Sequence, residues 1–86
     1  MEEQVKKAIL EVYKYSCVGS GLHIVLDDEN VENNHIEWCL NNSIPEIENP
    51  EERNACESCA ELLLQLTVKE RERIVHGYGR KWGFEY

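Results

Sequence analysis

The 86-residue chain carries 17 acidic and 9 basic residues, a net charge of −8 and a hydrophobic share of 42%. This length predicts one thin-cored domain over residues 1–86, and the composition is typical of globular proteins. The excess of acid argues against charge-driven binding to nucleic acid or anionic membranes. No apolar run approaches the roughly 18–20 residues of a membrane span, and the N-terminus lacks a signal-peptide pattern. We therefore expect a cytoplasmic protein.

Hydrophobic periodicity predicts a small, mostly α-helical domain with four helices. The first helix covers residues 3–16, because Val5, Ala8, Ile9 and Val12 recur on one face. The second helix runs from about residue 31 to residue 41 or 42, and Asp28 or Asn30 is available to cap its start. A loop over residues 41–48 is expected to follow.

The third and fourth helices have clear start signals. Asn49 followed by Pro50 is typical of a helix start, and the apolar face that follows predicts a helix over residues 50–66. Thr67 and Glu70 have the spacing of a capping box, which predicts a last helix to residue 75 or 76, ended by Gly77 and Gly79. The expected core consists of Ile9, Val12, Ile36, Leu40, Ala60, Leu63 and Leu66.

One short strand pairing is an optional addition to this fold. Residues 22–26 form an apolar run with β-branched residues, although a buried helical turn fits this run as well. Trp82, Phe84 and Tyr86 alternate along the C-terminal tail, which places three rings on one side of an extended chain. The tail could pair with residues 22–26 within the chain or across a homodimer; the alternative is a free terminus.

The acidic residues concentrate in the middle of the chain. Ten of them lie between Asp27 and Glu57, and Arg53 is the only basic residue there. One interpretation is an ordinary solvated surface; the other is a face that binds a basic partner protein. The residues of the candidate binding face are Asp27, Asp28, Glu29, Glu32, Glu46, Glu48, Glu51 and Glu52.

Two pairs of metal-ligating residues lie one helical turn apart. His35 with Cys39, and Cys56 with Cys59, together form a Cys3His set, which is a composition that structural zinc sites use. The alternative is core packing without a cofactor, because cysteine is among the most buried residue types and all four residues fall on apolar faces. In a cytosolic chain we expect the thiols to be reduced.

No motif in the sequence indicates an enzyme. The chain lacks a phosphate-binding glycine loop and a nucleophile elbow. Asp28, Asn30 and Glu32 resemble the start of a calcium loop, but Asn33 and Cys39 occupy positions that require Gly and Glu. We therefore predict a non-catalytic protein.

Residues 22–39, Leu-His-Ile-Val-Leu-Asp-Asp-Glu-Asn-Val-Glu-Asn-Asn-His-Ile-Glu-Trp-Cys, resemble a segment of short bacteriophage and prophage proteins. Those proteins share the pattern L-H-I-V-x-D-D-x-N-V-x-x-x-H-[IV]-x-[FW]-C, and the similarity covers roughly residues 17–76. Val18 stands where relatives often carry a second cysteine. The resemblance directs attention to His23, Asp27, Asp28, Asn30, His35 and Cys39.

The resemblance implies a phage or prophage accessory protein in the cytoplasm of a bacterial host cell. We expect it to bind a host protein with a basic surface, as an inhibitor of a host defence or nucleic-acid-binding factor, without direct contact to nucleic acid or membrane. The alternative is a zinc-binding or metal-dependent catalytic domain. Its centre would combine His23, Asp27, Asp28, His35 and Cys39.

Overall fold

The computed structural model describes residues 2–15, 22, 25–26 and 31–78. The structure defines the bounds of four α-helices in this part of the chain: α1 (Glu2–Lys14), α3 (Asn33–Trp38), α4 (Pro50–Leu64) and α5 (Val68–Tyr78). Helix α3 continues into a π-helical turn, η2 (Cys39–Ser43), and a 3-10 turn, η3 (Ile44–Glu46). None of the described residues lies in a β-strand. The predicted mostly helical fold with four helices is confirmed.

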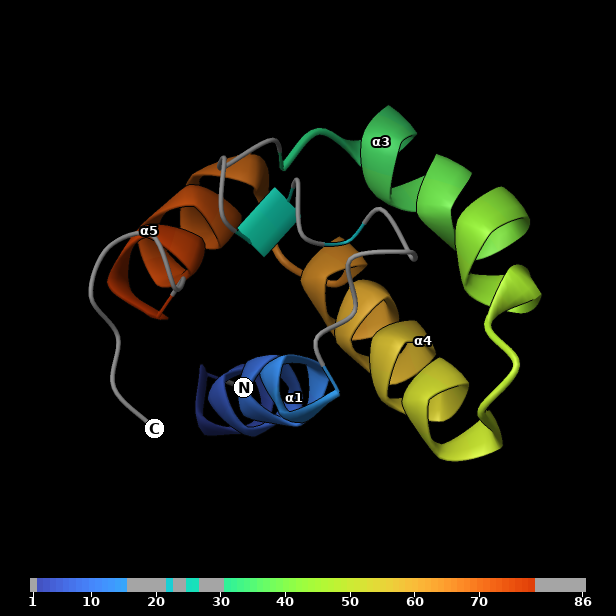
Figure 1. Ribbon diagram of the computed structural model, residues 1–86. Coiled ribbons are helices and arrows are strands. Elements are labelled where there is room, and N and C mark those ends of the chain that lie inside the picture. The colour runs from blue at the N-terminus through green and yellow to red at the C-terminus, as the bar shows by residue number, and fades with distance from the viewer. Residues whose placement is uncertain (1, 16–21, 23–24, 27–30, 79–86) are drawn as a thin grey trace.

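Helix α4 lies at the centre of the arrangement (Figure 1). It packs against α1 on one side and against α3 and η3 on the other, while α1 also contacts α5. The predicted stripe of α1 faces this core, since Val5, Ala8, Ile9 and Val12 are all buried. Of the seven expected core residues, six are buried and Leu40 is partly buried against the others.

The segment around Leu22 differs from the strand interpretation. Leu22, Val25 and Leu26 are helical and completely buried. Positions 22, 25 and 26 have the spacing of residues that share one face of a helix, and all three side chains belong to the same core. The other residues of this segment and the tail over residues 79–86 lie outside the described residues, and so does the proposed pairing between them.

The predicted loop over residues 41–48 is helical for most of its length. The Asn42 side chain donates to the Trp38 carbonyl oxygen at 3.1 Å, and the Ser43 hydroxyl donates to the Cys39 carbonyl oxygen at 3.4 Å. Each bond joins a side chain to the backbone carbonyl four residues earlier, as in a helix. The polar side chains of Asn42 and Ser43, which had favoured a loop, therefore support helical turns. The start of this helix also differs from prediction, because Glu32 occupies the N-cap and makes no side-chain cap bond.

The starts of α4 and α5 are confirmed atom by atom. Asn49 Oδ1 accepts from the backbone N–H groups of Glu51 and Glu52 at 2.9 and 3.4 Å. In the capping box, the Thr67 N–H donates to Glu70 Oε1 at 3.0 Å, and the Glu70 N–H donates to Thr67 Oγ1 at 3.2 Å. The predicted end of α5 is wrong, because Gly77 lies inside the helix, where nothing lies within 4 Å of an added Cβ.

A buried arginine connects the start of α3 to the turn between α4 and α5. Arg71 is 3% exposed. Its Nη1 donates to the Val31 carbonyl oxygen at 2.7 Å, and its Nε and Nη2 donate to the Leu66 carbonyl oxygen at 3.3 and 3.0 Å. No ion pair within the described residues involves this guanidinium, so backbone carbonyls alone compensate its burial.

Candidate functional site

The candidate site is the acidic surface along the edge from α3 to the start of α4, on the right in Figure 1. Its carboxylates are exposed except for that of Glu52, which is half-buried. We define this acidic surface as Glu32, Glu37, Glu46, Glu48, Glu51 and Glu52. Asp27, Asp28 and Glu29 of the predicted face lie outside the described residues.

Nothing in the described part of the chain neutralises this surface through an ion pair. Arg53 is the base closest in sequence, and its Nη1 donates to the Ile47 carbonyl oxygen at 2.8 Å, where it holds η3 against α4. The ion pair that the structure shows, between Arg73 Nη1 and Glu2 Oε1 at 3.0 Å, joins α5 to α1 instead. The negative charge from α3 to α4 is therefore available to a partner.

Trp38 follows Glu37 directly at the end of α3. It is 54% exposed, although tryptophan is among the largest apolar side chains. Sequence reasoning missed this residue. The available signal was the apolar stripe of the helix, which collects Ile36 and Cys39 on one face and leaves Trp38 outside it.

The cysteines of the predicted zinc set are core residues. Cys39, Cys56 and Cys59 are free thiols with no exposed surface. Burial raises the pKa of the Cys39 and Cys59 thiols, and nearby Cys56 raises both further. This placement is the one expected for packing.

His35 does not complete a metal site with these thiols. It is half-buried, and its Nε2 is buried without a hydrogen-bond partner in the described residues. Residues 2–15, 22, 25–26 and 31–78 contain no group of three or more His, Cys, Asp or Glu that could hold a metal ion. The structure therefore does not bring His35, Cys39, Cys56 and Cys59 together as zinc ligands. His23, Asp27 and Asp28 of the metal-dependent alternative lie outside the described residues.

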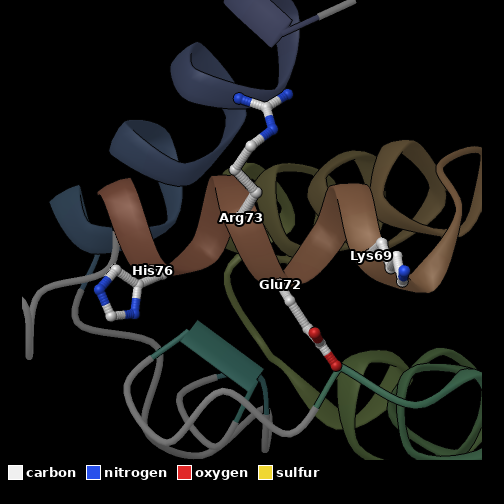
Figure 2. Close-up of a pocket in the computed structure, with 4 residues that line it drawn as sticks. All are labelled: Lys69, Glu72, Arg73 and His76. Atoms are coloured by element: carbon white, nitrogen blue, oxygen red, sulfur yellow. The ribbon is translucent and has the colours of Figure 1, made fainter.

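Hollows on the surface of the described residues include one along α5 and one between α1 and α4. Lys69, Glu72, Arg73 and His76 line one of about 560 Å3 along α5. Figure 2 shows Arg73 pointing toward α1, where it meets Glu2, and Glu72 pointing the opposite way. The second hollow, of about 400 Å3, is a groove between α1 and α4. The mixed charges of the α5 hollow favour no single ligand class.

Comparison with known proteins assigns no family. No family model matches the chain, and no curated protein or solved structure matches it significantly. Within the described ranges, no helix is both long and apolar enough to cross a membrane. The resemblance to phage and prophage proteins and the cytoplasmic location stay predictions.

Proposed function

We propose that this protein acts without catalysis, by binding a basic partner protein through the acidic surface between α3 and α4. In the setting that the sequence resemblance implies, it is a phage or prophage accessory protein and the partner is a host protein. A basic surface on such a partner is typical of nucleic-acid-binding factors, so the expected effect is inhibition of one of them.

The observation that carries this proposal is the exposed Trp38, which adjoins Glu37 in the chain, together with the glutamates of the acidic surface, none of which forms an ion pair within the described residues. Protein interfaces concentrate binding energy in a few large side chains, among which tryptophan is enriched, and surround them with polar groups. Charges at the rim accelerate encounter with an oppositely charged partner. Glu37 and the glutamates at the start of α4 provide that rim.

The test is affinity capture from bacterial host lysate over a salt series, with identification of the bound protein. A variant in which Glu46, Glu48, Glu51 and Glu52 are all glutamine tests the surface. We expect the wild-type chain to retain a basic protein that elutes as salt rises, and the variant to lose it. A partner retained equally at high salt, or by the variant, would contradict the proposal.

A matched variant controls for net charge. Glu3, Glu57, Glu61 and Glu72 are exposed and lie outside the acidic surface, so replacing these four by glutamine makes the same change of charge. This control should keep the partner. Trp38→Ala should weaken binding at least about 30-fold, the effect of losing an interface hot spot of about 2 kcal/mol. Val68→Ala, which truncates an exposed apolar residue on α5, should leave binding unchanged.

A further inference from the structure

The groove between α1 and α4 has small residues along its lining and acidic residues beside them. Ala8 of α1 and Ala55 and Ser58 of α4 line it, together with Glu11, Glu51 and Tyr15. Its volume of about 400 Å3 falls within the range of roughly 300–1,000 Å3 that ligand sites occupy. Small side chains leave this space open although the two helices pack against each other.

The hydroxyl group of Tyr15 binds one of the two carboxylates that line the groove. Its Oη donates to Glu51 Oε2 at 3.2 Å. Partial burial, this hydrogen bond, and the negative charges of Glu51, Glu11 and Glu52 raise the pKa of the Tyr15 phenol above its usual 10.0. Glu11 of α1 and Glu51 of α4 thus both line the groove together with Tyr15.

Neither Glu11 nor Glu51 forms an ion pair in the described part of the chain. Lys14 Nζ lies 5.9 Å from the centre of the Tyr15 ring, so this aromatic face already attracts one positive charge. A cation that entered the groove would meet two carboxylates and the edge of this ring.

We propose that the groove receives one arginine side chain of the basic partner protein. This inference rests on the proposed function, because it names the group through which the partner is recognised. The aliphatic stem would lie along Ala8 and Ala55, and the guanidinium would donate to Glu11 and Glu51. Arginine fits better than lysine because its planar fork bonds two acceptors at once and stacks on aromatic rings.

The test needs no partner, because N-acetylarginine amide is the probe. A titration followed by backbone amide chemical shifts should move the signals of Ala8, Ala55 and Ser58. The uncharged analogue N-acetylcitrulline amide should leave those signals in place. N-acetyllysine amide should bind at least several-fold more weakly; equal binding of the lysine probe would overturn the assignment to arginine.

Two variants locate the probe. The double variant Glu11→Gln with Glu51→Gln should raise the dissociation constant at least about tenfold, since both charge-assisted hydrogen bonds are lost. Glu57→Gln with Glu61→Gln changes the charge equally on exposed positions of α4 outside the groove and should leave the dissociation constant unchanged. Ser58→Leu should abolish binding by filling the groove, while the helical signal in circular dichroism stays intact.

The outcomes separate the groove from the wider function. If the arginine probe shifts the same amide signals in the Glu11→Gln, Glu51→Gln variant as in the wild-type chain, or shifts signals near every acidic residue, the groove proposal is overturned. Capture of a basic partner protein would still support the proposed function in that case. Conversely, specific binding of the arginine probe without any captured basic partner would support the groove site and contradict the proposed function.

Discussion

At the scale of single residues, the buried thiols have a measurable chemical consequence. Cys56 and Cys59 have no exposed surface, and burial raises the pKa of Cys59 far above its usual value. Only the thiolate reacts with disulfide labelling reagents, so both low access and low thiolate content slow the reaction.

We predict slow labelling in a Cys17→Ser background, which leaves the three described cysteines. Native protein should react slowly, and denatured protein should show three fast thiols. Labelling of Cys56 and Cys59 at the denatured rate would contradict both packing and zinc binding. A zinc content near one per chain, lost together with helicity on adding a chelator, would favour the zinc hypothesis over packing alone.

Glu70 links the stability of α5 to pH. Its bonds with the backbone N–H and the hydroxyl of Thr67 and the nearby charge of Arg73 hold the pKa of its carboxyl below the usual 4.5. A lowered folded-state pKa means that the carboxylate contributes stability above pH 4.5, and this contribution is lost as the pH falls through the folded-state value.

We therefore predict that Glu70→Gln flattens the fall in melting temperature between about pH 6 and pH 3 and lowers stability at neutral pH. The matched control is Glu72→Gln, because Glu72 is an exposed glutamate two residues further along α5 that takes no part in the capping box. An identical pH profile for Glu70→Gln and the wild-type chain would show that the capping box contributes nothing in solution.

At the scale of elements, local side-chain signals predicted the starts of α4 and α5 well, whereas the predicted cap of α3 at Asp28 or Asn30 was wrong. Asn49 with Pro50, and Thr67 with Glu70, make their bonds within three residues, so no distant contact is needed to form them. The wrong predictions concern segments whose conformation depends on the neighbouring structure rather than on their own sequence. Residues 41–46 look like a loop by composition, and Gly77 looks like a helix end, yet both continue a helix that has already formed.

Arg71 and Arg73 lie on the same helix but in opposite environments. Arg71 is buried, with three hydrogen bonds to backbone carbonyl oxygens, whereas Arg73 forms an exposed ion pair with Glu2. Without the guanidinium, the Val31 and Leu66 carbonyl groups lose these donors, and a hydrogen bond to a charged group contributes about 1.5–3 kcal/mol.

We predict that Arg71→Met lowers the free energy of unfolding by at least about 2 kcal/mol. Arg73→Met should cost less than about 1 kcal/mol, the usual limit for an exposed ion pair. Denaturant titrations of both variants measure the difference. Equal losses would show that the bridge from α5 to residue 31 is not formed in solution.

At the scale of the whole molecule, the sequence and the fold contribute differently to the candidate sites. The acidic surface was predictable, because its glutamates are close together along the chain and charged side chains stay exposed. Trp38 was overlooked, since tryptophan is expected inside. The groove could not be predicted, because it exists only where Ala8 and Glu11 of α1 meet Glu51, Ala55 and Ser58 of α4.

A single hydrophobic cluster joins α1, the turn around Leu22, α3, α4 and α5. Leu63 of α4 is completely buried in it, while the neighbouring Leu62 is only partly buried. The same truncation at these two positions therefore separates the loss of core contacts from any change in helix propensity, which is equal for both.

We predict that Leu63→Ala lowers the free energy of unfolding by about 2–5 kcal/mol, as for leucines in closely packed cores. Leu62→Ala should cost less than half as much. The melting temperature of the Leu63 variant should fall by at least about 8 °C, given the shift of about 4–8 °C per kcal/mol for a domain of this size. Because all the helices share the cluster, circular dichroism and tryptophan fluorescence should report the same transition. A loss below about 1 kcal/mol would place Leu63 outside the core, and separate transitions would show that the helices unfold independently.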